Sequence, residues 1–228
     1  MSTLTQRPPT LTPGPSATPS PRPTNTSTPQ PQWVTDFAQP ILNAIASRTP
    51  NFQDDFHDKS GGWQREDWCG ITRMKYQDGQ LVLTSCGAQR KNIDYPDFVA
   101  ELDGRFLPGT KGNAEWAIFF RDNGGPAYFF GLHDTAGTVG LWGFGNDFQS
   151  FPAAAVPGYG TNHLLLIAKK SEFAFYVNGK PLRYLKDAKC RWGNIWFRTW
   201  GNSNAAAYPS IVAFDNFKLW DISDISIP

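Results

Sequence analysis

The chain has 228 residues, a formal net charge of +1 at pH 7 and 40% hydrophobic residues. A charge this close to zero offers no general electrostatic attraction for nucleic acid or for an anionic membrane, so neither is expected as a partner. No apolar stretch is long enough to span a bilayer, so no membrane insertion is expected within this chain. The length suits one β-type domain with a flanking segment.

Residues 1–32 are predicted to be a disordered linker. Ser2 to Gln32 is nearly all Pro, Thr, Ser and Gln, with Arg7 and Arg22 as its only charges. Such a segment cannot offset its own chain entropy, so it should stay extended and partly polyproline. Pro/Thr stalks are common outside the cell, and we therefore expect an extracellular or cell-surface protein whose export signal or anchor is not present in this sequence. A cytoplasmic protein with a disordered tail is the alternative.

Residues 33–50 are predicted to form a short helix that packs on the domain. Asp36 is a favourable N-cap, and Pro40 falls in the first turn, where a missing amide hydrogen costs little. Pro50 ends the segment. Four apolar side chains share one helical face: Phe37, Ile41, Ala44 and Ile45.

Residues 51–228 are predicted to form an antiparallel β-sandwich. Apolar and polar residues alternate there with a period of two, and Gly-rich, Asp-Gly or Asn-Gly turns separate the alternating segments. Many short strands with such turns are typical of a sandwich whose aromatic rings fill the space between two sheets. The clearest segments are 98–103, 114–121, 127–133, 138–144, 162–169, 172–178 and 211–220.

Cys69 and Cys86 flank a hairpin whose turn is Asp78-Gly79. Counting outward from the turn sets Cys86 opposite Ile71, one diagonal step from Cys69. A small bulge would bring the two sulfurs together, and an oxidising compartment would then allow a disulfide. Two small buried side chains without a bond are the alternative. Cys190 has no obvious partner.

A series of short motifs runs in order along most of residues 51–219. They are Asp54-Asp55-Phe56, Ser60-Gly61-Gly62-Trp63, 76–81, 97–103, 117–121, 128–131, 175–179 and 212–217. Together they resemble the concanavalin A-like lectin/glucanase superfamily, and within it the laminin-G-like and 3-keto-disaccharide hydrolase-type domains of bacterial surface proteins. The resemblance implies a jelly-roll fold, and members of this superfamily bind sugars, cleave them or bind proteins.

Asp54, Asp55 and Asp215 form a candidate calcium site. The first and last strands of a jelly roll run side by side, so these carboxylates and Asn216 would converge, and hard oxygen ligands suit calcium. The resemblance points the same way, because many related sugar-binding sandwiches hold a structural calcium near their termini. The alternative is that Asp55 and Asp215 cap turns or accept backbone amides. No other cofactor is expected.

Glu101 and Asp103 are the first candidates for catalysis, with His133 as a third. Residues two apart in a strand share a face, and glycosidases use two carboxyl groups that flank the bond to be cut. The pair is similar to the Glu-x-Asp-x-x-Glu strand of the family-16 glucanases, but here no third carboxylate follows to protonate the leaving group. A solvated strand face, paired with Arg105 or Arg121, is therefore the favoured interpretation.

Aromatic residues support binding better than catalysis. The chain has nine tryptophans, more than one core of this size needs. Sugar rings stack on flat aromatic faces, and polar neighbours bond their hydroxyl groups. Trp196, Arg198 and Trp200 share one face of a predicted strand as an aromatic and basic platform, although core packing is the alternative for any one ring. The candidate ligand-binding residues are Trp116, Tyr128, Trp142, Trp196, Arg198 and Trp200.

The leading hypothesis is a non-catalytic carbohydrate-binding or adhesion module at the cell surface, with a polysaccharide or glycoconjugate as its partner. One alternative is a glycan-cleaving hydrolase of the keto-disaccharide hydrolase type. Another is a structural or protein-interaction module that binds a protein partner or self-associates through an exposed strand edge. An aromatic-lined groove would favour sugar binding, a carboxylate-lined pocket an enzyme, and a flat apolar patch a protein partner.

Overall fold

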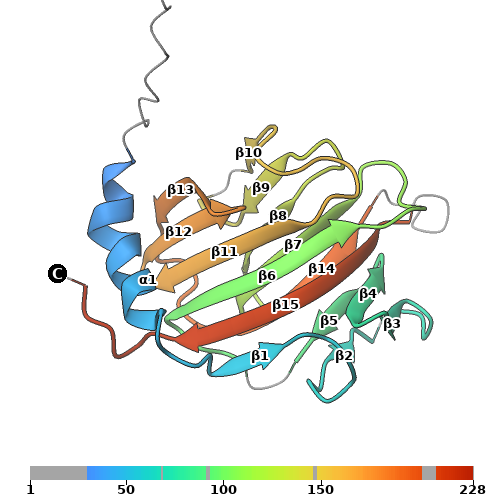
Figure 1. Cartoon of the computed structure of the whole chain (residues 1–228), viewed down its shortest axis with the longest axis horizontal. Coiled ribbons are helices and arrows are strands. Elements are labelled where there is room, and N and C mark those ends of the chain that lie inside the picture. Colours follow the sequence, from blue (N-terminus) through green and yellow to red (C-terminus); the bar gives the residue numbers. More distant parts are fainter. Residues whose placement is uncertain (1–29, 68, 91–92, 146–147, 202–208, 228) are drawn as a thin grey trace, which may run out of the picture. The chain divides into compact units, whose positions relative to one another are not determined.

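The computed structural model describes residues 30–67, 69–90, 93–145, 148–201 and 209–227. Within these residues, two antiparallel sheets lie face to face and a short helix packs outside them (Figure 1). The predicted sandwich and the helix that precedes it are confirmed. The predicted linker at residues 1–32 lies almost wholly outside the described residues.

One sheet, called the β6 sheet below, contains the first and last strands of the fold. Its strands are β1 (Phe52–Asp54), β3 (Met74–Gln77), β4 (Gln80–Thr84), β6 (Phe98–Phe106), β11 (Asn162–Lys169), β12 (Glu172–Val177), β13 (Lys180–Lys186) and β15 (Ile211–Asp221). Their order is β13-β12-β11-β6-β15-β4-β3. β1 pairs with β15, with Phe52 opposite Leu219, as expected for a jelly roll.

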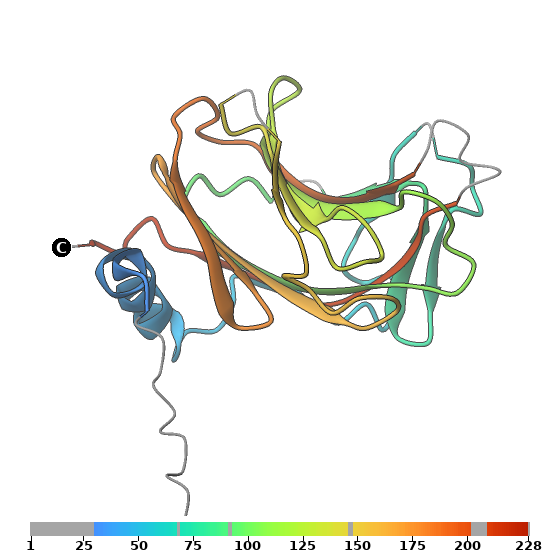
Figure 2. The same ribbon diagram turned by 90° about the horizontal axis from the view of Figure 1, so that it is seen from above.

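The other sheet, called the β7 sheet, packs against it. Its strands are β2 (Gln64–Arg65), β5 (Gly87–Gln89), β7 (Glu115–Asp122), β8 (Tyr128–Leu132), β9 (Val139–Trp142), β10 (Gln149–Phe151) and β14 (Asn194–Trp200). Their order is β10-β9-β8-β7-β14-β5-β2. Figure 2 shows both sheets bent in the same sense, so that the outer face of the β7 sheet is the hollow side.

The core between the sheets consists largely of aromatic rings. On β7, Trp116 and Phe120 turn inward and are fully buried, as a period of two requires. Trp116 meets Phe214 of β15 edge to face, with ring centroids 5.5 Å apart. A Cβ atom at Gly104 of β6 would lie 2.6 Å from the Trp116 ring. The absence of a side chain on one sheet thus makes room for the largest ring of the other.

The helical segment lies against the outer face of the β6 sheet, beside one end of the sandwich (Figure 2). A π-helical turn, Val34–Ala38, runs directly into helix α1, Gln39–Ile45. The apolar face of this segment packs on Val99 of β6, Ile167 of β11 and Trp220 of β15. No helix among the described residues is long and apolar enough to cross a membrane.

The predicted N-cap at Asp36 is wrong. The chain is already helical from Val34, and Trp33 occupies the capping position without a side-chain hydrogen bond. Val34 and Phe37 are both buried. Burial of an apolar helical face contributes more to helix stability in proteins than a local cap does, which explains the earlier start.

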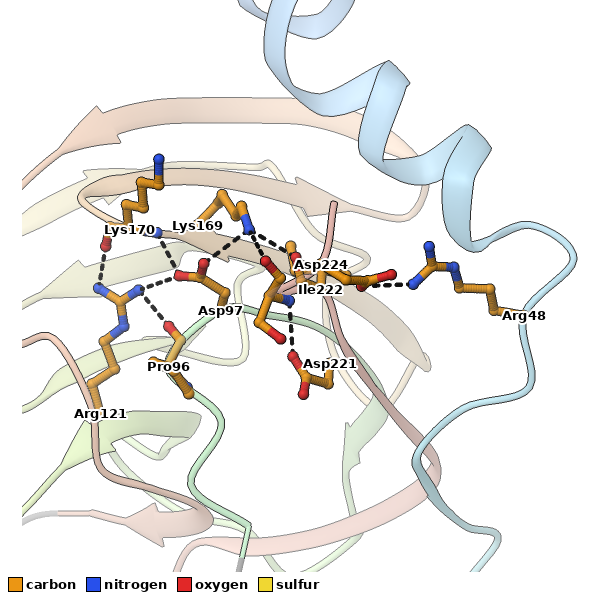
Figure 3. A network of polar contacts seen from close by, with 10 residues as sticks. Arg48, Pro96, Asp97, Arg121, Lys169, Lys170, Asp221, Ile222 and Asp224 are labelled. Atoms are coloured by element: carbon orange, nitrogen blue, oxygen red, sulfur yellow. Dashed lines mark hydrogen bonds and ion pairs between the residues drawn. The ribbon is translucent and has the colours of Figure 1, made fainter. Parts of the chain in front are cut away.

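A buried polar network ties five segments of the chain together near the start of β6 (Figure 3). The carboxylate of Asp97 lies 2.9 Å from Nζ of Lys169 and 3.8 Å from the guanidinium of Arg121. Lys169 also donates a 2.8 Å hydrogen bond to the carbonyl oxygen of Ile222, beyond β15. Arg121 donates to the carbonyl oxygens of Pro96, Lys170 and Cys190. Each buried charge therefore has partners, without which its desolvation would destabilise the fold.

Cys69 and Cys86 form a disulfide, with their Cα atoms 5.6 Å apart. Cys69 follows β2, and Cys86 stands where the chain passes from β4 of one sheet to β5 of the other. The bond closes a loop with a sequence separation of 17. It therefore stabilises the end of the sandwich at which the two sheets are connected.

Replacing both cysteines, as C69A/C86A, should lower the free energy of unfolding by about 3 kcal/mol, because the loop is no longer closed in the unfolded chain. For a domain of this size that corresponds to a fall in Tm of about 6 to 12 °C, measurable by calorimetry. Reductant should lower the Tm of the wild type and leave that of the double variant unchanged. Two alkylatable thiols at Cys69 and Cys86 in unreduced protein would contradict the prediction.

Candidate functional site

The outer face of the β7 sheet carries three parallel rows of side chains, each running across neighbouring strands. The cross-strand register places Trp196, Phe119, Phe129 and Trp142 in one row. It places Arg198, Ala117, Gly131 and Gly140 in the next. The third row begins with Trp200 opposite Glu115. Strand pairing thus gathers residues from β14, β7, β8 and β9 on the hollow side of the sandwich.

The aromatic row is a pile of rings that stack on one another. Phe119 lies between Trp196, at 4.1 Å, and Phe129, at 4.2 Å, with interplanar angles below 30°. Trp142 continues the stack beyond Phe129, at 5.7 Å and 29°. Phe148 caps it at 4.6 Å from Trp142. Since these rings cover one another's faces, mainly their edges point to solvent.

The row of small residues makes space beside this stack. A Cβ atom at Gly140 would lie 2.3 Å from Cη2 of Trp142, so the indole lies over the backbone of β9. Gly131 of β8 faces Ala117 of β7, and a Cβ atom there would come within 1.9 Å of the carbonyl oxygen of Trp116. Because the side chains of this row are small or absent, an aromatic ring can lie close to the backbone of the sheet there.

Trp200 is the ring that crosses this row. Its plane is inclined by 64° to 86° to the planes of Phe119, Phe129 and Trp142, with centroid distances of 5.6 to 6.3 Å. The faces of Phe119 and Phe129 are covered by their stacking partners, so Trp200 meets the edges of these rings. Edge-to-face packing is the favoured geometry for such pairs. Trp200 thus packs steeply inclined against the edges of the stacked rings, and its side chain stays partly exposed.

Glu115 and His133 supply the polar side of the site. Nδ1 of His133 lies 3.0 Å from Oε1 of Glu115, and the two side chains are 36% and 14% exposed, respectively. Burial raises the pKa of Glu115 above its ordinary value, and interactions with His133 and Trp200 offset only part of that rise. A partly desolvated carboxyl group next to a half-exposed indole is well placed to bond a polar ligand.

These rows enclose a depression of about 490 Å³ on the hollow side. Its lining is aromatic with one carboxylate and one guanidinium, the mixture found where ligands are both packed and oriented. The lining residues are Glu115, Phe119, Phe129, Trp142, Arg198, Trp200 and Gly201. Trp142 and Trp200 are half-buried, whereas Phe119 is only 6% exposed.

The structure brings four of the six predicted ligand-binding residues together. Trp142, Trp196, Arg198 and Trp200 all lie on this outer face, although Trp196 is only 8% exposed within the stack. The other two predictions are wrong, because Trp116 and Tyr128 point the opposite way and are fully buried.

Trp116 and Tyr128 serve the core instead. Trp116 fills the space above Gly104, as described for the fold. The Tyr128 ring stacks on Phe144 at 4.3 Å, and its hydroxyl donates to the carboxylate of Asp187. Burial, together with that bond, raises the pKa of Tyr128 above its ordinary value. Neither side chain reaches a surface where a ligand would bind.

Glu101 and Asp103 share a face, as predicted, but on the outer side of the β6 sheet, away from the depression. Asp103 lies 2.7 Å from Nδ1 of His163, and Nζ of Lys218 lies 3.9 Å from Glu101. The two residues therefore belong to a charged strand face, as the sequence favours. Pairing with Arg105 or Arg121 is wrong: Arg105 donates to Gln80, and Arg121 is buried near Asp97.

The oxygen atoms of the predicted calcium ligands are used within the chain. Oδ1 of Asp54 accepts from the backbone N–H of Phe56 and Oδ2 from the indole of Trp63, both at 2.8 Å. Asp55 caps a turn by accepting from the backbone N–H of His57. Asp215 accepts from the backbone N–H of Asn216. Among the described residues no three His, Cys, Asp or Glu side chains gather into a metal site, and a calcium ion at this place stays an untested prediction.

Glu115 is the site residue that sequence reasoning missed. It begins a strand, and nothing nearby in the sequence marks it, since His133 and Trp200 are distant along the chain. The available signal is that Glu115 and Phe119 fall on the same face of an alternating strand. Only the register with β8 and β14 shows which residues they meet.

Comparisons with known proteins bear on the fold. No protein-family model and no curated protein matches the chain. Among solved structures, the β-glucanase of Bacillus licheniformis superposes with a TM-score of 0.61 at 13% identity, over 76% of this chain and 99% of that one. The carbohydrate-binding module CBM66 of Bacillus subtilis gives 0.54 at 17%, over 70% and 95%.

A structure described with endo-acting O-glycanases of the human gut microbiota gives a TM-score of 0.61 at 15% identity, over 77% of this chain and all of that one. Identities this low show a shared fold alone. The chain has the jelly-roll fold of these proteins, and the fold that the superfamily resemblance implies is confirmed. The finer likeness to laminin-G-like and 3-keto-disaccharide hydrolase-type domains stays a prediction.

The Asp103–His163 pair should make stability depend on pH. Its hydrogen bond raises the pKa of His163 above 6.5, so its contribution is full below that pH and is lost as pH rises through the folded-state value. The His163 side chain is 38% exposed, so the contribution should stay below about 1 kcal/mol. Urea unfolding at pH 6 and pH 8.5 should show wild type losing more stability than H163Q. Equal losses would contradict the prediction, and H57Q, which changes an exposed histidine, is the control.

Proposed function

We propose that this chain binds carbohydrate, without cleaving it, on the outer face of the β7 sheet, and that it does so at the cell surface. The observation that carries the proposal is the depression in which the half-exposed Trp142 and Trp200 lie beside Glu115 and Arg198. An aromatic-lined depression of this kind favours sugar binding, whereas a carboxylate-lined pocket would favour an enzyme and a flat apolar patch a protein partner.

The chemistry of the lining suits a sugar. A pyranose presents C–H groups on its faces and hydroxyl groups around its rim, so it stacks on an aromatic face while its rim bonds polar groups. The outward face of Trp200 offers the stacking surface. Glu115 accepts hydrogen bonds from hydroxyl groups and Arg198 donates them. A polysaccharide or glycoconjugate is therefore the proposed partner.

The fold and the disulfide are compatible with this proposal. The fold is shared with a β-glucanase and with a carbohydrate-binding module, so it is compatible with both cleavage and binding of a glycan. Only the residues of the site can distinguish these two functions. A disulfide between Cys69 and Cys86 persists in oxidising surroundings, which supports an extracellular location. The Pro/Thr-rich composition of residues 1–32 supports display on a stalk.

A hydrolase is the second candidate function, and the partly buried carboxyl group of Glu115 favours it. Burial raises the pKa of this carboxyl group, which suits a general acid. Glycosidases pair such an acid with a second carboxylate some 5 to 10 Å away. Glu115 is the one carboxylate among the described residues that line the depression, so binding without cleavage is the better-supported function.

Substitution of Trp200 tests the binding proposal. Wild-type protein should show saturable binding on a polysaccharide array, and W200A should weaken it at least about tenfold, or ~1.4 kcal/mol, because the stacking face is removed. W192A is the matched control, since Trp192 is 57% exposed and is not among the residues that line the depression. A wild type that binds no polysaccharide, or equal losses in W200A and W192A, would refute the proposal.

Incubation with the bound polysaccharide separates binding from cleavage. Wild-type protein should release no new reducing ends, because one carboxylate does not complete the acid and base pair. The assay is reducing-end detection over a long incubation, with E115Q run beside the wild type. Release by the wild type that disappears in E115Q would establish the hydrolase instead.

A further inference from the structure

The aromatic rings of the site differ in whether a face remains available. Phe119 is covered on one face by Trp196 and on the other by Phe129. Trp142 is covered likewise by Phe129 and Phe148. A surface that holds an extended glycan by stacking offers a free ring face to each of several consecutive sugars. This stack presents edges instead, and edges do not support a row of stacked sugars.

Trp200 is the exception among the rings that line the depression. It meets three of the stacked rings at steep angles, no described ring stacks face to face on it, and its side chain is partly exposed. The most exposed ring of the stack is Phe148, at its end, which is 42% exposed. Phe148 lies within 30° of the plane of Trp142, which is itself inclined by 64° to Trp200. The two open rings are therefore not coplanar, and one straight chain cannot stack on both.

The polar groups also converge on this single ring. Trp200 is directly opposite Glu115 across the β7–β14 pairing, and Arg198 precedes Trp200 by two residues on the same face. His133 stands behind Glu115 at 3.0 Å and helps to hold the carboxylate in place. An acceptor and a donor thus flank one stacking face, where they would bond hydroxyl groups of the same sugar.

From this arrangement we infer that the site takes one sugar unit at a time, the terminal or branching residue of a glycan, stacked flat on Trp200 between Glu115 and Arg198. The inference rests on the proposed function and adds the mode of recognition. The rest of the glycan would leave the depression toward solvent rather than run along the sheet. Ala117 contributes to this geometry, because it is fully buried in one apolar cluster with Trp200 and its small side chain leaves room for the indole.

Chain-length dependence tests the inference. Laminari-, cello-, xylo- and manno-oligosaccharides of one to six units are titrated into wild-type protein by calorimetry. In a series that binds, the Kd should change by less than about threefold between two and six units, because added sugars find no further ring face. A tightening of about tenfold with each unit added up to four would overturn the inference and leave the proposed function intact.

Blocking the chain end gives an independent test. The binding oligosaccharide is immobilised through its reducing end and, separately, through its non-reducing end. Protein should be retained by one attachment and not by the other, since only a free terminal sugar reaches Trp200. Equal retention by both attachments of an unbranched chain would overturn the inference. Failure of every oligosaccharide and of the polysaccharide array to bind would instead overturn the proposed function, and the inference with it.

Two variants separate the position of the indole from its presence. A117L keeps Trp200 but places bulk beneath it, and should weaken binding of the terminal sugar at least about tenfold. W200F keeps a flat ring and should retain more affinity than W200A. Thermal unfolding of each variant checks that it is folded. Wild-type affinity in a folded A117L would contradict the stated orientation of Trp200.

Discussion

The alternation along β7 places large apolar side chains on both faces of one sheet. Trp116 and Phe120 point into the core, whereas Phe119 points outward and is still only 6% exposed. A strand that is apolar on both faces is normally covered on both sides by other elements. Here the outward ring is covered by rings from β14 and β8, so the neighbouring strands have to supply Trp196 and Phe129. The stack thus completes the burial that β7 requires, and the proposed binding surface is formed by the parts of these rings that stay exposed.

The same steric arrangement occurs in the core between the sheets and on the outer face of the β7 sheet. Inside, the missing side chain at Gly104 makes room for the ring of Trp116. Outside, the missing side chain at Gly140 makes room for that of Trp142. Interiors are close-packed, so a Cβ atom at either glycine would force a ring or a strand to move. Whether an indole lies flat therefore depends as much on the small residue beneath it as on the indole itself.

The strands could be read from the sequence because an alternating pattern is local. The expected segment 162–169 coincides with β11, and 211–220 differs from β15 by one residue. The sequence also places Trp196, Arg198 and Trp200 on one face, which the register confirms. Alternation does not say which face is inward, so it does not distinguish Trp116, which lies in the core, from Trp200 on the outer face. Nor could Glu115 be predicted, since its partners come from strands that are distant in sequence.

Two carboxylate–histidine pairs distinguish the outer face of the β6 sheet from that of the β7 sheet, where the site is proposed. Asp103 and His163 meet on the β6 sheet, where hydrogen bonds from His163 and Asn216 outweigh the effect of burial and lower the pKa of Asp103. Glu115 faces His133 in a similar way, but burial dominates and raises its pKa. The first pair is satisfied by its own neighbours, so it stabilises a strand face. In the second pair, the interactions with His133 and Trp200 offset only part of the desolvation of Glu115. This carboxyl group lies beside the partly exposed Trp200, where hydroxyl groups of the proposed ligand would complete its hydrogen bonding.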